Sequence, residues 1–150
     1  FAENAGSSYL TCVLLRVDAA RRTLTYVNAG HPAGLMLGRS GRRLLSRGGP
    51  PVGLFQETAY ESEVVSLEVG DLGVIVSDGI TEAMEEDGVP SADVLNRSVC
   101  RIPEPRTPER VCDALMEIAK RSPGPRGVTG WQDDKTVFAF SFEDHGSRGA

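Results

Sequence analysis

Residues 67–84 read LEVGDLGVIVSDGITEAM, and this stretch decides the fold. The apolar run from Leu72 to Val76 is typical of a short buried strand, and Gly70-Asp71 before it is typical of a tight turn. The strand ends in Ser77-Asp78-Gly79, and the pattern from Ile80 to Glu86 predicts a short helix. An acid at the end of a buried strand has a rigid support, so Asp78 is the first candidate for a chemical role.

Strands dominate the rest of the first half. Besides 72–76, the predicted strands of this half are 9–17, 24–27, 35–37 and 60–67, with a rigid Gly/Pro loop at 48–51. In the second half, Ser91 can cap a helix that runs to about Cys100, and Thr107-Pro108 can begin another.

The last helix and the last strand have clear apolar patterns. Helical spacing places Val111, Leu115, Ile118 and Ala119 on one face. A closing strand over 135–142 alternates, with Val137, Ala139 and Ser141 on one side and Phe138, Phe140 and Phe142 on the other. Strands followed by helices and one final strand predict an α+β layered fold with an antiparallel sheet.

Composition limits the function classes. The 150 residues are 40% hydrophobic and 25% charged, as expected of one globular domain, and the net charge of −5 argues against nucleic acid as a partner. No apolar stretch approaches the roughly 18 residues that span a bilayer, and no signal peptide is evident, so we expect no membrane insertion. Three cysteines without metal-type spacing indicate free thiols in a reducing, cytoplasmic location.

Two acidic positions and one histidine are candidates for chemistry. The alternative for Asp78 is an Asx turn or helix cap. Asp133-Asp134 precedes the closing strand, and adjacent acids there suit a hard cation such as Mg²⁺ or Mn²⁺, the alternative being a plain acidic loop. His31, in Asn28-Ala29-Gly30-His31-Pro32, is a base, a ligand or a turn-stabilising residue. Motifs of serine hydrolases, phosphate-loop enzymes and zinc fingers are absent.

Four motifs together resemble a known family. YVNAGHPAGLML at 26–37, GGPPVGLF at 48–55, LEVGDLGVIVSDGITEAM at 67–84 and DDKT at 133–136 occur in the order and spacing of the SpoIIE-like branch of the PPM (type 2C) metal-dependent serine/threonine phosphatases. The resemblance covers residues 9–142. It implies a sandwich of two antiparallel sheets flanked by helices, with two Mn²⁺ or Mg²⁺ ions at one end.

The resemblance also assigns residues. Asp78 matches the metal-binding acid of the family's Thr/Ser-Asp-Gly motif, and Asp133 matches the metal-binding first acid of its Asp-Asp motif. The supporting positions are Gly79, Asp134, Asn28, Gly30 and His31, the last three as structural residues. The implied reaction is hydrolysis of phosphoserine or phosphothreonine by a metal-activated water, on a small regulatory protein of the sigma-factor partner-switching type.

The sequence departs from the family at its beginning. The family's Gly-Asp-x-x-Asp-type segment and its following Asp with Gly-His-Gly are absent, since residues 1–25 contain only one aspartate, Asp18. We therefore expect the C-terminal two-thirds of a catalytic domain at 1–142, a polar tail at 143–150, and an inactive isolated chain. Missing strands would leave unpaired sheet edges, which leaves a homodimer open.

Two alternatives stay open at this stage. The first is a truncated or degenerate phosphatase fold that acts as a non-catalytic interaction module. The second is a haloacid-dehalogenase-type phosphatase, because Asp78-Gly79-Ile80-Thr81 also resembles that superfamily's nucleophile loop. That superfamily requires an acid where this chain has Val76, and a parallel βαβ architecture that the pattern does not show.

Overall fold

The computed structural model describes residues 8–84, 88–121 and 134–143, which form eight strands and three helices. In chain order these elements are β1 (Cys12–Asp18), β2 (Thr23–Ala29), β3 (Gly34–Gly38), β4 (Gly41–Leu45), β5 (Gly48–Gly49), β6 (Glu63–Ser66), β7 (Leu72–Val76), α1 (Asp78–Ala83), α2 (Ser91–Cys100), α3 (Pro108–Arg121) and β8 (Val137–Ser141). Most of the predicted tail at 143–150 lies outside the described ranges.

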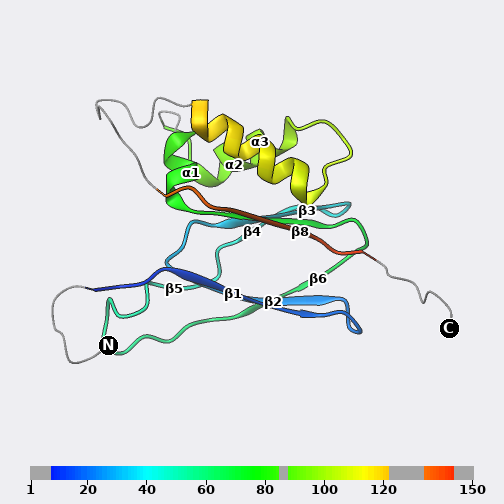
Figure 1. The fold of residues 1–150 in the computed structure, drawn as a ribbon. Coiled ribbons are helices and arrows are strands. Elements are labelled where there is room, and N and C mark those ends of the chain that lie inside the picture. The colour runs from blue at the N-terminus through cyan, green and yellow to red at the C-terminus, as the bar shows by residue number, and fades with distance from the viewer. Residues whose placement is uncertain (1–7, 85–87, 122–133, 144–150) are drawn as a thin grey trace.

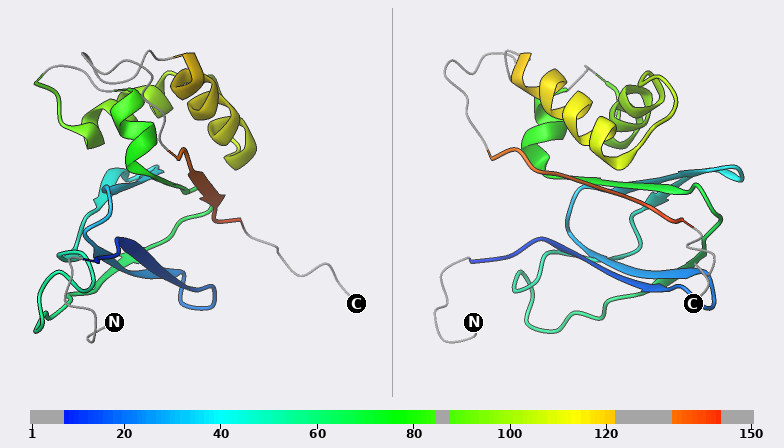
Figure 2. Two further views of the ribbon diagram at one scale, coloured as in Figure 1. Left: turned by 60° about the vertical axis from the view of Figure 1, so that its left-hand side comes forward. Right: turned by 45° about the vertical axis from the view of Figure 1, so that its right-hand side comes forward.

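Two four-stranded sheets lie face to face, and the helices cover the outer face of one of them (Figure 1). The covered sheet has the order β4-β3-β7-β8 and is antiparallel throughout. In the other sheet β2 pairs antiparallel with β1 and β6 and parallel with β5. Figure 2 shows the same three layers from two other directions. The predicted α+β sandwich is confirmed, and within the described residues its helices flank one side.

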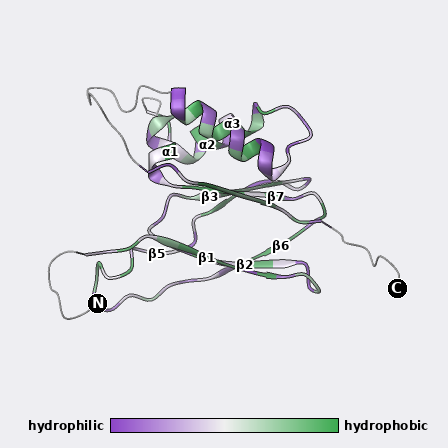
Figure 3. Ribbon diagram, viewed as in Figure 1, coloured by the Kyte–Doolittle hydropathy of each residue, from purple (hydrophilic) through white to green (hydrophobic). Residues whose placement is uncertain are grey.

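The core has two parts, one on each side of the covered sheet. Every residue of β7 is buried, and Leu72, Val74 and Val76 form one cluster with apolar side chains of α1, α2 and α3. The second cluster lies between the sheets around Leu24, Tyr26, Met36 and Leu45. Figure 3 shows the hydrophobic segments in the sheet beneath the helices. Burial of this apolar surface is what holds the layers together.

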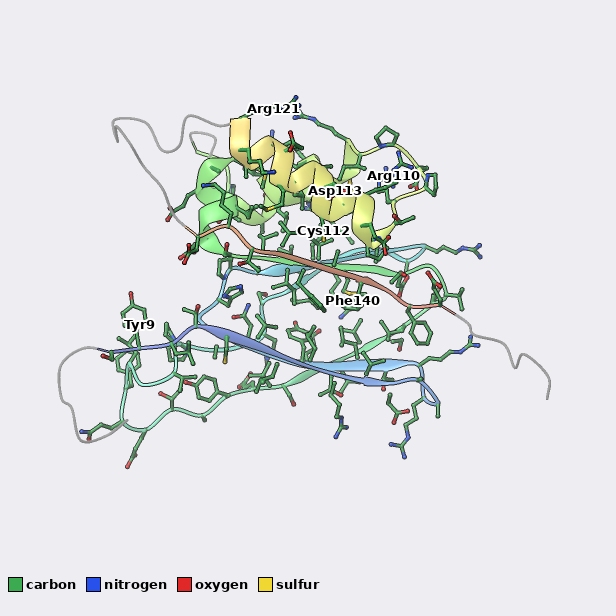
Figure 4. All side chains as sticks on the ribbon, viewed as in Figure 1. Tyr9, Arg110, Cys112, Asp113, Arg121 and Phe140 are labelled. Atoms are coloured by element: carbon green, nitrogen blue, oxygen red, sulfur yellow. The ribbon has the colours of Figure 1, made fainter. Side chains whose placement is uncertain are left out.

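The predicted alternation of β8 is confirmed. Val137 and Ala139 pack against the helical cluster, whereas Phe140 and Phe142 pack against the cluster between the sheets. Figure 4 shows Phe140 pointing from β8 into the space between the sheets. β8 therefore joins the two parts of the core, and this fixes the register of the segment that precedes it.

Several sequence-based details were wrong. Ile118 is 41% exposed, because the buried stripe of α3 runs through Val111, Leu115 and Ala119 and is flanked by half-buried Cys112 and Met116 instead. α1 begins at Asp78 rather than Ile80, and the predicted end at Glu86 lies among residues that the structure does not describe.

The helix caps were predicted with mixed success. Pro90 occupies the cap position before α2, and Ser91 is the first helical residue instead of the cap. The cap before α3 is confirmed, since the Arg110 amide donates to Thr107 Oγ1 over 3.4 Å.

Two further features of the chain were also tested. All three cysteines are free, as predicted; Cys100 is exposed, and Cys12 and Cys112 are half-buried. Within the described ranges, no helix combines the length and the apolar content that crossing a membrane would require.

Candidate active site at the end of β7

Asp78 stands where the buried strand β7 passes into α1. The first helical turn is fixed by the Ile80 amide, which donates to the Ser77 carbonyl over 3.1 Å, and by Thr81 Oγ1, which donates to the Asp78 carbonyl over 3.0 Å. Gly79, Ile80 and Thr81 are buried, whereas Asp78 is exposed. The backbone of Asp78 is therefore held from the protein side while its carboxylate faces outward.

The Asp78 carboxylate has one occupied oxygen. Its Oδ1 accepts a hydrogen bond from the Gly79 amide over 3.0 Å, and no described residue donates to Oδ2. An Asx turn would use the amide two residues on, but the Ile80 amide donates to the Ser77 carbonyl, so the Asx-turn interpretation does not account for this contact. The second oxygen is open to a ligand.

The segment before β8 lies beside this acid. The β7–β8 ladder pairs Val76 with Val137 and continues one residue further, where the Ser77 amide donates to the Thr136 carbonyl over 3.0 Å. Ser77 Oγ also donates to the Asp134 carbonyl over 3.0 Å and accepts from the Thr136 amide over 2.9 Å. The structure thus places the Asp134 backbone against Ser77, the residue directly before Asp78. Asp133 lies outside the described residues.

A hollow of about 410 Å³ opens beside Asp78, a volume within the usual range of ligand pockets. Three segments of the chain form its wall: the loop before β3, the first turn of α1 and the start of α2. The lining residues are Pro32, Ala33, Asp78, Thr81, Glu82, Ser91 and Ala92. Two carboxylates one helical turn apart, Asp78 and Glu82, therefore line one open hollow.

A larger hollow of about 630 Å³ lies at the other end of β3 and β7. Two of its arginines already have partners, since Arg106 binds the Ile102 and Cys100 carbonyls and Arg42 pairs with Asp93 over 3.0 Å. Because the smaller hollow adjoins the exposed acid, we take that one as the candidate active site.

The segment from Asn28 to His31 shapes the same end of the molecule. Asn28 is 4% exposed; its side chain donates to the Leu45 carbonyl over 3.1 Å and accepts from the His31 amide over 2.8 Å. Gly30 has φ +69°, and a Cβ there would lie 2.4 Å from the Pro51 ring, so only glycine fits. These are the contacts that structural roles for Asn28 and Gly30 would require.

His31 has one side-chain contact that the sequence analysis did not find. Its Nδ1 lies 3.2 Å from Thr11 Oγ1, which ties the chain before β1 to the loop that leads to the hollow. The sequence analysis also gave Ser77 no role beyond its place at the end of the strand. A signal existed only for Ser77, because serine before the first residue of a helix is a common capping residue.

The donor chemistry here suits a hard divalent cation, but the described donors are few. Carboxylate oxygens are the ligands that Mg²⁺ and Mn²⁺ prefer. Within residues 8–84, 88–121 and 134–143, no group of three His, Cys, Asp or Glu side chains gathers to hold a metal ion. The Asp78 carboxylate has the oxygen donors that such an ion prefers, and a complete ligand set would need further donors beside it.

The fold argues against the haloacid-dehalogenase alternative. That superfamily requires a parallel sheet, whereas β7 runs antiparallel to both of its neighbours, β3 and β8.

The comparisons with known proteins agree with one another. A family model described as stage II sporulation protein E (SpoIIE) matches residues 1–143. The phosphoserine phosphatase RsbP of Bacillus subtilis (strain 168) is 35% identical over 75 residues, which is 49% of this chain and 19% of RsbP. The phosphoserine phosphatase RsbU of the same organism is 26% identical over 116 residues, which is 76% of this chain and 32% of RsbU. The chain thus spans about a fifth to a third of these relatives.

A solved structure shows the same fold. The phosphatase domain of the cell fate determinant SpoIIE from Bacillus subtilis, presoaked with manganese, matches with a TM-score of 0.68 and 22% identity. The match covers 89% of this chain and 56% of the SpoIIE domain.

Proposed function

We propose a function from one premise: this chain belongs to the SpoIIE family of PP2C-type phosphatase domains. On that premise its activity is hydrolysis of phosphoserine or phosphothreonine on a small regulatory protein of the sigma-factor partner-switching type. The observation that carries the proposal is the meeting of two distant segments, since Ser77 beside Asp78 binds the backbone at Asp134. RsbP and RsbU, the relatives it is similar to, are phosphoserine phosphatases by name.

We assign Asp78 and Asp133 as metal ligands and catalytic residues, with Gly79 and Asp134 in support. Gly79 holds one oxygen of Asp78 through its amide, which aims the other oxygen away from the backbone. Bound Mn²⁺ or Mg²⁺ would supply an activated water and neutralise charge on the phosphoryl oxygens. The hollow between α1, α2 and the loop before β3 would receive the phosphorylated side chain.

This chemistry requires no nucleophile from the protein. Burial is the main reason that the pKa of the Cys112 thiol is raised, which is the reverse of what a cysteine nucleophile needs. Its Sγ lies 3.8 Å from the Val137 carbonyl, on the inner side of α3. Cys112 is therefore a packing residue in this proposal.

The proposal also covers how the chain divides into a domain and a tail. We propose that residues 1–142 are part of the catalytic domain, that 143–150 form a tail, and that activity needs further ligands from an upstream segment. The location we propose is cytoplasmic, and pairing of exposed sheet edges into a homodimer stays open.

The test is Mn²⁺-dependent hydrolysis of a phosphoserine peptide by the full-length protein. Asp78→Asn and Asp133→Asn should each lose almost all activity, and the isolated 150-residue chain should show little or none. Full activity of either variant would refute the ligand assignment.

The non-catalytic interaction module is the second candidate. The small number of metal-binding side chains among the described residues favours it. Absence of Mn²⁺- or Mg²⁺-dependent hydrolysis by the full-length protein would decide for the module.

A further inference from the structure

Ser77 occupies a helix-capping position without capping the helix. It is the residue before α1, with the extended backbone (φ −69°, ψ 162°) of a typical N-cap, yet its side chain makes no capping hydrogen bond. Serine at this position ordinarily accepts from an amide of the first turn. The hydroxyl of Ser77 is directed to another part of the chain instead.

That other part is the segment before β8. Ser77 Oγ donates to the Asp134 carbonyl over 3.0 Å and accepts from the Thr136 amide over 2.9 Å, while the Ser77 amide donates to the Thr136 carbonyl over 3.0 Å. One residue therefore binds the backbone on both sides of Lys135. The partners lie 57 and 59 residues away along the chain, so these contacts are tertiary.

The hydrogen bonds of Ser77 lie directly beside Asp78 in the candidate active site. We call these three hydrogen bonds of Ser77 the clasp. Asp78 follows Ser77 directly, so the clasp fixes the Asp134 carbonyl relative to the backbone of Asp78. β7 is fully buried beneath it, and the β7–β8 ladder ends at Val76–Val137. Without the hydroxyl, Ser77 would keep one of its three bonds to this segment, the one from its amide to the Thr136 carbonyl.

We infer that Ser77 is a positioning residue, which sets the distance between Asp78 and the backbone at Asp134. The inference rests on the proposed function, because the distance matters for a metal ion that both segments hold. Ser77 itself touches neither metal nor substrate. Loss of a group that orients metal ligands typically lowers metal affinity about 10- to 100-fold.

The first test measures the clasp without metal. Amide hydrogen exchange at Thr136 should be at least about tenfold faster in Ser77→Ala than in the unmodified chain, because the amide loses its acceptor. Ser77→Thr keeps the hydroxyl and should retain protection. Equal exchange in the unmodified chain and in Ser77→Ala would overturn the inference.

The second test measures Mn²⁺ binding by the full-length protein, followed by the electron paramagnetic resonance signal of free Mn²⁺. Ser77→Ala should raise the Kd about tenfold, Ser77→Thr should restore it to within about twofold, and Ser141→Ala, a matched change at the far end of β8, should have no effect. If Ser77→Ala does not fold, Ser77→Cys keeps the volume and weakens both hydroxyl bonds, and the same rise in Kd is expected.

The outcomes separate the two proposals. If Asp78→Asn weakens Mn²⁺ binding and Ser77→Ala does not, the positioning role is wrong and the proposed function stands. If Asp78→Asn leaves binding unchanged, or the full-length protein binds no Mn²⁺, the proposed function fails and the positioning role fails with it.

Discussion

β7 has an aspartate at each end, and the two differ in exposure and in the hydrogen bonds of their carboxylates. Asp71, before the strand, is 7% exposed, and its Oδ2 accepts from the Glu68 amide over 2.9 Å. Asp78, after the strand, is exposed, and its Oδ2 accepts from no described residue. At both ends β8 continues the pairing, through Phe142 beside Asp71 and Thr136 beside Ser77.

The comparison shows how one residue type serves two purposes on one strand. A buried carboxylate has to be satisfied by the protein, so Asp71 closes the turn that includes Gly70 at φ +93°. An exposed carboxylate on a rigid support keeps an oxygen for a ligand, which suits Asp78 to chemistry. Of the two acids, Asp71 is the one whose side chain closes a turn, because it accepts from the Glu68 amide three residues earlier.

The largest expected effect separates the two acids by activity. In the full-length protein, Asp78→Asn should lower Mn²⁺-dependent phosphatase activity at least about 100-fold, or about 2.7 kcal/mol in the barrier. Its free energy of unfolding should change by less than about 0.5 kcal/mol, because the side chain is exposed. Steady-state kinetics and urea unfolding measure the two effects. A strongly destabilised Asp78→Asn would mean that the acid is structural, like Asp71.

Asp71→Ala should give the opposite pattern. The change leaves the Glu68 amide without its acceptor, so the free energy of unfolding should fall by about 2 to 3 kcal/mol. Activity per folded molecule should stay within about twofold. Urea unfolding with Asp78→Asn as the matched variant is the measurement, and an unchanged unfolding midpoint would contradict the structural role.

Gly38 lies against Asp71, so it gives a second test of the structural role of that acid. A Cβ at Gly38 would lie 1.9 Å from Asp71 Oδ1, so Gly38→Ala should destabilise the fold by about 1 to 2 kcal/mol. Part of that cost should disappear when Asp71→Ala is already present, because the clash partner is gone. A double-mutant cycle measures this coupling, and strict additivity would show that the two residues do not meet.

Tyr26 extends the comparison to a third polar side chain, which is buried and has the smallest expected effect. Its hydroxyl donates to Glu63 Oε2, and burial, followed by this bond, raises the pKa of Tyr26 above its ordinary value of 10.0. A raised pKa means that the folded state holds the proton longer than the unfolded state. The stability from this group is therefore present below about pH 10 and is lost as the pH rises through the folded-state pKa.

Tyr26→Phe should cost about 1 kcal/mol at neutral pH and should flatten the loss of stability above about pH 10. Unfolding of both proteins over a pH series gives the answer. An identical alkaline loss in both would place its source elsewhere.

Sequence reasoning reached the parts of the fold where apolar pattern and structure coincide. β7 is a continuous apolar run with every residue buried, and β8 alternates between two cores, so both were predicted. β4 was missed because Gly41, Arg42 and Arg43 are exposed and carry no apolar pattern. β5 was missed because it is Gly48-Gly49, where pairing with β2 needs the absence of a side chain: a Cβ at Gly48 would lie 1.8 Å from the Asn28 carbonyl oxygen.

The candidate site was predictable in part. Asp78 was identified because an acid directly follows a buried strand. Ser77 was not, because its partners are set by the antiparallel register of β7 with β8, and register between segments so far apart is a property of the folded core. Asp133 stays a prediction.

The most direct test of the central claim is paramagnetic broadening by Mn²⁺, observed by NMR on the full-length protein. The account predicts that the Gly79 and Lys135 amide signals weaken together at the lowest Mn²⁺ concentrations, while those of Gly70 and Asp71 at the other end of β7 persist. In Asp78→Asn the effect should vanish from both segments. Broadening that reaches only one of the two segments, or that starts at the Gly70 end, would contradict the claim that these segments hold one ion.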